Sequence, residues 1–155
     1  MRLKKIIVVM VICLIAIPAF AQEVTKNTMD SVRDALKAQK RAFIAVNMQL
    51  TQAEDAKFWP VYDRYQTDLE KINQKIGDLI LDYAKNFETL TDKKADELLK
   101  KNLSLEKEML QLKTSYLPKF SAVLPAKKVA RYYQLENKIQ AVKRYDLADN
   151  IPLVK

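Results

Sequence analysis

Residues Phe58 to Tyr83 read FWPVYDRYQTDLEKINQKIGDLILDY. Its large apolar side chains recur at steps of four and three residues without a miss, at Phe58, Tyr62, Tyr65, Leu69, Ile72, Ile76, Leu79 and Tyr83. This spacing puts the side chains on one side of an α-helix and is typical of a coiled-coil seam. We therefore predict a long helix over residues 52–87 that packs along one flank.

Three other segments carry helical periodicity and predict helices over residues 29–48, 92–121 and 125–146. The first has one stripe, interrupted at Gln39: Met29, Val32, Leu36, Phe43, Val46 and Leu50. The third has two adjacent stripes, with Leu98, Leu105, Met109, Leu112 and Tyr116 beside Leu99, Leu103, Leu110 and Leu117, and the fourth carries Val129, Tyr132, Leu135, Ile139 and Val142. The fold class is therefore all-α with four helices.

The starts of three helices are visible in the sequence. Leu50, Thr51 and Glu54 predict a capping box, in which the Thr51 hydroxyl and the Glu54 carboxylate each satisfy a free backbone amide. Leu90 and Thr91 repeat the apolar residue and the cap before the third helix. Before the fourth helix, Leu124 is followed by Pro125, which suits a first helical position.

Two prolines predict the shape of the molecule. Pro60 and Pro118 lie inside the second and third helices, where a missing amide and a steric clash kink a helix. Each lies 29 residues from residue 89, at the predicted turn between these helices. In an antiparallel pairing the kinks fall at the same level, so we expect an elongated, bent helical hairpin with a concave, cradle-like side.

Residues 1–21 have the layout of a secretory signal peptide. Basic residues precede an apolar run over residues 6–17, and small residues end at Ala21, where we predict cleavage. The run of 12 residues is short of the roughly 20 needed to span a bilayer, so a retained membrane anchor is the weaker reading. Cys13 follows Ile12 rather than a small residue, which disfavours lipidation. We expect one helical domain over residues 22–155 in the periplasm, without stable membrane insertion.

The composition of residues 22–155 excludes many kinds of chemistry. This segment contains no Cys, no His and a single glycine, Gly77. Catalysis by a thiolate or a Ser-His-Asp triad, a zinc finger and a glycine-rich phosphate loop are therefore excluded. Asp78 with Asp82, and Asp92 with Asp96, place carboxylates one turn apart without a third ligand. We expect no enzyme activity, no metal and no cofactor.

Positive charge is concentrated in the second half of the chain. Residues 22–91 carry 10 basic and 11 acidic side chains, whereas residues 92–155 carry 14 basic and 8 acidic side chains. Export separates this basic protein from cellular nucleic acid. The candidate residues for binding clients or partners are Lys127, Lys128, Arg131, Tyr132 and Tyr133, with Trp59 and Tyr62. Three alternatives stay open: Tyr132 as a core residue, the lysines as a solvated face, and Phe58, Trp59 and Tyr62 as core or dimer packing.

The two related helix starts resemble the LTxxQ motif of periplasmic proteins of the Spy/CpxP type. Leu50, Ala56, Lys57, Phe58 and Trp59 align with Leu124, Ala130, Arg131, Tyr132 and Tyr133 at a constant offset of 74 residues. The first motif ends in Glu54 instead of Gln. The second keeps only Leu124, with Pro125 and Lys128 in place of Thr and Gln, so the chain resembles a diverged member.

The resemblance implies a cradle-shaped homodimer that holds unfolded or aggregation-prone clients in the envelope without ATP. Some relatives bind metal through histidines, which this chain lacks. We expect a chaperone-like protein of the envelope stress response. The alternative is an adaptor or modulator that acts on an envelope-stress sensor or another defined periplasmic partner. The two readings differ in how many unrelated clients the protein binds.

Overall fold

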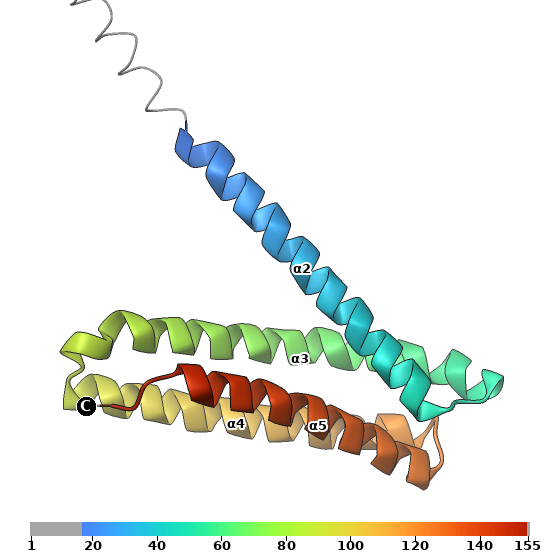
Figure 1. Cartoon of the computed structure of the whole chain (residues 1–155). Helices are drawn as coiled ribbons and strands as arrows, with labels where there is room; N and C mark the ends of the chain where they lie inside the picture. The colour runs from blue at the N-terminus through green and yellow to red at the C-terminus, as the bar shows by residue number, and fades with distance from the viewer. Residues whose placement is uncertain (1–16, 155) are drawn as a thin grey trace, which may run out of the picture. The chain divides into compact units, whose positions relative to one another are not determined.

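The computed structural model describes the backbone of residues 17–154 and the side chains of residue 28 and of residues 30–154. Within these residues the protein is all-α. Its elements are α2 (Ile17–Met48), α3 (Gln52–Asn86), the short 3-10 helix η1 (Phe87–Thr89), α4 (Asp92–Ser121) and α5 (Ala126–Asn150). Figure 1 shows these four long helices, which confirms the predicted fold class. The bounds differ at two ends, because α2 begins at Ile17 and not at residue 29, and α5 continues to Asn150 and not to residue 146.

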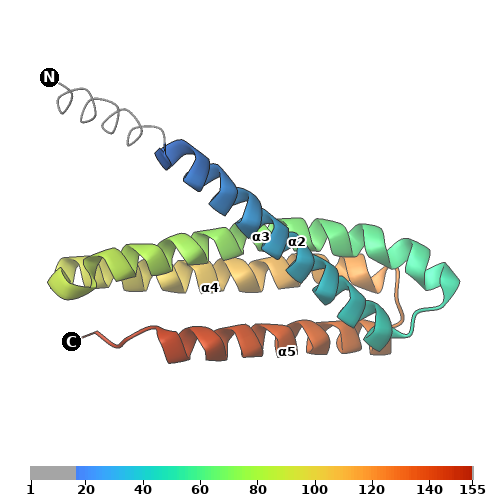
Figure 2. The ribbon, with the colours of Figure 1, turned by 45° about the horizontal axis from the view of Figure 1, so that its top comes forward.

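The chain divides into two units between Asn47 and Met48. The described part of the first unit is helix α2 up to Asn47. In the second unit α3 and α4 form the antiparallel hairpin that the sequence predicts, and both views show them side by side with α5 alongside (Figures 1 and 2). The single domain expected over residues 22–155 stays a prediction.

The predicted seam of α3 forms the core of the second unit. Its buried residues are Phe58, Val61, Tyr62, Tyr65, Leu69, Ile72 and Leu79, and Ile76 and Tyr83 are half-buried. At the hairpin turn Leu79 packs with Leu98 and Leu105 of α4, and Leu90 covers this cluster. Burial of these side chains at steps of three and four residues gives α3 its position against α4.

The predicted caps of α3 and α4 are confirmed. The Glu54 amide donates to the Thr51 hydroxyl at 3.3 Å and the Thr51 amide donates to the Glu54 carboxylate at 2.8 Å, which completes the capping box. The Lys94 amide donates to the Thr91 hydroxyl at 3.2 Å. The role of Pro125 differs by one residue. It is the N-cap of α5 and not its first helical residue, because its ψ of 149° is extended.

Of the two predicted stripes of α4, one is buried and the other is exposed. Leu98, Leu105, Met109 and Tyr116 are buried, and Leu112 is half-buried. The second stripe, which we call the leucine stripe, is exposed: Leu99, Leu103, Leu110 and Leu117 keep between 46% and 65% of their surface accessible. A thin hairpin cannot cover both stripes of one helix.

The apolar stripe of α2 is also exposed among the described side chains. We call Val32, Leu36, Phe43 and Val46, with 43% to 77% of their surface accessible, the α2 stripe. The buried residues of this helix are Ile44 and Met48, which lie beside the stripe. Met29, a further member of the predicted stripe, lies outside the described side chains.

Pro60 and Pro118 both lie inside continuous helices, α3 and α4. The matched kinks and the cradle shape stay predictions. Most of the predicted signal peptide, residues 1–16, lies outside the described residues, and the predicted cleavage site after Ala21 falls within α2. Within the described part of the chain, no helix has the length and apolarity that a membrane span needs.

Candidate functional site

Aromatic side chains gather at the end of the second unit where α3 and α5 begin and α4 ends. Phe58 and Phe120 have no accessible surface, and Tyr132 has 1%. The ring of Tyr132 lies 4.5 Å from that of Phe120 and 5.3 Å from that of Phe58, measured between centroids. Tyr62, Tyr65, Tyr116 and Tyr133 extend this cluster. Each of the three helices contributes rings, so the cluster holds this end of the unit together.

A buried carboxylate lies in the aromatic cluster. Glu136 is 2% exposed and accepts hydrogen bonds from Gln66 Nε2 at 3.0 Å and from the Tyr132 hydroxyl at 3.2 Å. Burial and the Glu136 charge raise the pKa of the Tyr132 hydroxyl well above its ordinary value. The same two causes raise the pKa of Tyr133 to about 12. These tyrosines are therefore neutral hydrogen-bonding groups at physiological pH.

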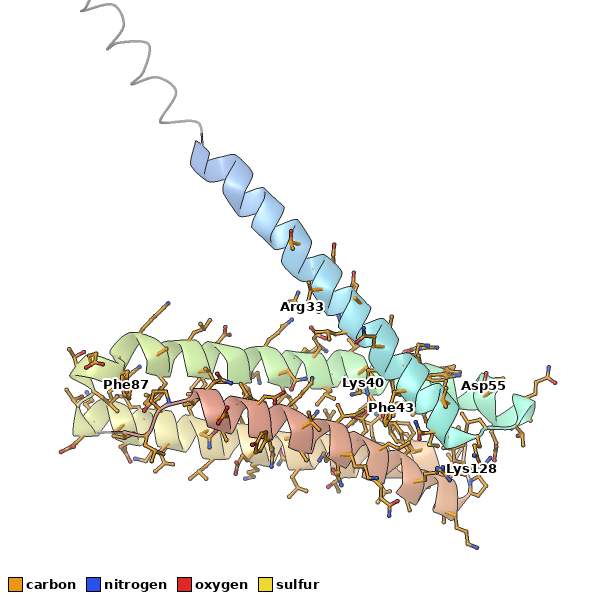
Figure 3. The ribbon with its side chains drawn as sticks, in the orientation of Figure 1. Arg33, Lys40, Phe43, Asp55, Phe87 and Lys128 are labelled. Atoms are coloured by element: carbon orange, nitrogen blue, oxygen red, sulfur yellow. The ribbon has the colours of Figure 1, made fainter. Side chains whose placement is uncertain are left out.

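The ends of the two related motifs meet in space. Lys128 Nζ donates a short hydrogen bond to the Glu54 carboxylate and a second bond, at 3.0 Å, to the Gln49 carbonyl. The bond from Lys128 is the main cause that lowers the pKa of Glu54, followed by the bond from the Thr51 amide. Figure 3 places Lys128 and Asp55 at one end of this unit and Phe87 at the other. We call Glu54 and Lys128 the motif clamp.

Of the seven candidate binding residues, five are buried or bonded within the protein and two are exposed. Tyr62 and Tyr132 are core residues, and Lys128 is held in the motif clamp. Trp59 and Tyr133 are half-buried, with the indole N–H donating to Asp55 at 2.6 Å and the Tyr133 hydroxyl donating to the Lys113 carbonyl at 2.7 Å. The remaining two candidates, Lys127 and Arg131, are exposed on α5. The core alternative for Tyr62 and Tyr132 is confirmed.

Lysines lie beside three of the four aspartates that are spaced one helical turn apart, Asp78, Asp82 and Asp96. Asp82 forms an ion pair with Lys94 at 2.9 Å, and this bond lowers the pKa of the carboxyl group. Asp96 pairs with Lys100 at 2.6 Å. Asp78 lines a shallow pocket of about 170 Å³ together with Lys75 and Lys101. Among the described side chains, no group of three or more His, Cys, Asp or Glu residues is arranged to hold a metal ion.

The leucine stripe of α4 is a second candidate site. Lys100 and Lys107 follow Leu99 and Glu106 by one residue, so their charges flank the stripe along one edge. A row of exposed leucines on one helix is unusual at the surface of a monomeric protein. The second apolar stripe of the third predicted helix indicated this exposed surface. The candidate binding residues chosen from the sequence nevertheless lay mainly in the basic cluster of α5.

Comparisons of the chain with protein-family models, with curated proteins and with solved structures found no match. The resemblance to the Spy/CpxP type therefore stays a prediction that rests on the two motifs.

Proposed function

We propose that the protein is an ATP-independent, chaperone-like binding protein of the cell envelope that holds unfolded or aggregation-prone clients. The observation that carries this proposal is the leucine stripe of α4. It offers apolar contact along a rigid helix without a closed pocket, which suits clients of varied sequence.

The charges beside the leucine stripe support the same function. Lysine side chains can lay their methylene stems along an apolar client segment and keep their ammonium groups in water. The surplus of positive charge in residues 92–155 adds attraction for acidic segments of a client. A stripe of four leucines gives a small contact area, which favours transient binding over a permanent complex.

The first test is suppression of aggregation. The purified protein, at low molar ratio, should reduce light scattering by two unrelated unfolding substrates without ATP. The double variant Leu103→Ser with Leu110→Ser should lose most of this activity. The control is Leu81→Ser, because Leu81 is 59% exposed but lies on α3.

The outcomes separate the proposal from its alternative. Loss in the stripe variant with full activity of the control supports client binding at the leucine stripe. Equal activity of both variants contradicts that site. If the protein leaves both substrates to aggregate but binds one envelope protein, it is an adaptor or modulator.

A further inference from the structure

Every exposed charge over residues 126–145 of α5 is positive. This range contains six basic side chains, of which Lys128 is held in the motif clamp and five are exposed: Lys127, Arg131, Lys138, Lys143 and Arg144. The only acidic residue in the range, Glu136, is 2% exposed. Acidic side chains return only after the range ends, at Asp146 and Asp149. A helix surface with exposed bases and no exposed acid attracts an anionic partner.

Helical spacing places three of these bases, a valine and a tyrosine on one side of α5. We call this row the basic face: Lys127, Arg131, Lys138, Val142 and Tyr145. Successive members are separated by four, seven, four and three residues, which keeps them in line on a helix, and the row extends over about 27 Å. The opposite side of α5 carries the buried residues of the aromatic cluster. The basic face therefore points away from the hairpin of α3 and α4, along one side of which α5 lies (Figure 2).

The bases of this face lack an acidic partner within the described part of the chain. Lysines elsewhere on the second unit pair with carboxylates at 2.6 to 2.9 Å: Lys71, Lys75, Lys94 and Lys100. In contrast, Lys127, Arg131 and Lys138 form no ion pair and no hydrogen bond with a described residue. Lys127 and Arg131 lie four residues apart, a spacing at which like charges repel each other on a helix. An anionic partner would relieve this repulsion.

The end of the basic face favours a lipid surface over an acidic protein as this partner. Val142 and Tyr145 keep 63% and 74% of their surface accessible. Tyrosine is enriched where membrane headgroups meet hydrocarbon, and lysine stems lie along apolar surface while their ammonium groups stay in water. Bases followed by exposed apolar and aromatic side chains on one helix are typical of a helix that lies in a membrane interface. A partner that offered carboxylates alone would leave Val142 and Tyr145 in water.

We propose that the basic face of α5 docks the protein on the surface of a membrane that contains anionic phospholipids. Helix α5 then lies parallel to the surface, with Lys127, Arg131 and Lys138 among the headgroup phosphates and with Val142 and Tyr145 at the edge of the hydrocarbon. The docking surface lies on α5 and the leucine stripe lies on α4, so this inference goes beyond the proposed function and does not depend on it.

Sedimentation with lipid vesicles tests the docking. Protein that begins at Gln22, without the apolar run of the predicted signal peptide, would be mixed with vesicles of phosphatidylglycerol and phosphatidylcholine in equal parts, or of phosphatidylcholine alone. We expect binding to the anionic vesicles only. Salt at about 0.5 M should weaken this binding, because it screens charges at an exposed surface.

Removal of the three bases should remove most of the binding. The triple variant Lys127→Gln, Arg131→Gln and Lys138→Gln should bind anionic vesicles more than about tenfold more weakly, because each base at an anionic surface strengthens binding about fivefold. All three side chains are exposed, so far-UV circular dichroism should show the helix content of the parent.

A matched control separates the basic face from net charge. The triple variant Lys85→Gln, Lys93→Gln and Lys107→Gln removes the same charge from exposed lysines of α3 and α4. Because these lysines lie on other helices, this variant should lose less than about threefold in binding to the anionic vesicles.

A fluorescent label locates the docked surface. The chain's only cysteine, Cys13, lies in the predicted signal peptide, so Tyr145→Cys places a single thiol on the basic face of the protein that begins at Gln22. A polarity-sensitive dye on this thiol should brighten and shift to the blue with anionic vesicles. The same dye on Leu81→Cys, an exposed position of α3, should stay unchanged.

The outcomes decide the proposal. Binding to anionic vesicles that the α5 variant loses and the control variant keeps supports docking through the basic face. No vesicle binding, equal binding to neutral vesicles, equal loss in both triple variants, or an equal dye response at position 81 overturns it. Binding to soluble poly-glutamate without binding to vesicles also overturns it and assigns the face to acidic proteins. Aggregation assays without lipid decide the proposed function separately.

Discussion

Replacing Phe58 by Ala should remove the centre of the aromatic cluster. The Phe58 side chain has no accessible surface, and its ring lies within 6 Å of the rings of Trp59, Tyr62, Phe120 and Tyr132. Truncation of a buried phenylalanine to alanine destabilises proteins by about 3–5 kcal/mol. At about 4 °C per kcal/mol for a chain of this size, the melting temperature should fall by about 12–20 °C.

Urea unfolding measures this loss with an internal probe. Trp59 is the only tryptophan, and its ring lies 5.0 Å from that of Phe58, so its fluorescence reports on this end of the unit. Far-UV circular dichroism reports on the helices as a whole. The matched control is Leu81→Ala, which should cost less than about 0.5 kcal/mol because Leu81 is exposed. A loss below about 1 kcal/mol for Phe58→Ala would refute the assignment of these rings to the core.

The N-cap of α3, the residue that precedes it by two positions, two tyrosines with raised pKa values and the signal peptide can each be tested. Thr51→Ala should lower stability by about 1 kcal/mol in urea unfolding, because it removes the N-cap of α3, and should leave client binding in the cold unchanged. Gln49→Gly should raise the melting temperature slightly, because Gln49 has a φ of 48° that glycine adopts at lower cost. Burial raises the pKa of Tyr116 and Tyr133 to about 12. Their contribution to stability should therefore be complete below about pH 10 and should be lost as the pH rises toward about 12. Melting curves combined with tyrosinate absorbance would measure this loss. Protein recovered from the cell envelope should have an intact mass that begins at Gln22, and a full-length cytoplasmic product would contradict the predicted export.

The starts of α3 and α4 were predictable because their capping signals are local, whereas the start of α2 and the end of α5 carry no such cap and were predicted twelve residues too late and four too early. Thr51 and Thr91 cap helices through backbone groups only three residues away, and the structure begins α3 and α4 at the predicted residues. The seam of α3 was predictable because a period of three and four residues has one structural interpretation. The start of α5 was wrong by one residue, because Pro125 suits an N-cap as well as a first helical position.

The roles of the candidate binding residues required the tertiary structure. Lys128 looks like a surface lysine in the sequence, and its partners, Gln49 and Glu54, are more than 70 residues away. The sequence around Tyr132 is equally compatible with a residue that contacts a client and with a core residue. The rings from three helices that surround Tyr132 show that it is a core residue. Glu136 lies four residues after Tyr132 and seven after Val129, on the apolar face of α5, so its position indicated burial while its charge indicated exposure.

The motif clamp bears on how a relationship between distant proteins can be recognised. Two glutamine side chains at these positions could meet through their amides, and a carboxylate and an ammonium group span the same gap with greater strength. Replacement of two glutamines by Glu54 and Lys128 would keep the contact between the helix starts but would change both residues that define the end of the motif. It also makes the two positions interdependent, because reversing the charge of Glu54 or Lys128 alone would set like charges side by side. If an ion pair replaced two amides during evolution, a relationship to the motif would be detected from the two positions considered together and not from either residue alone.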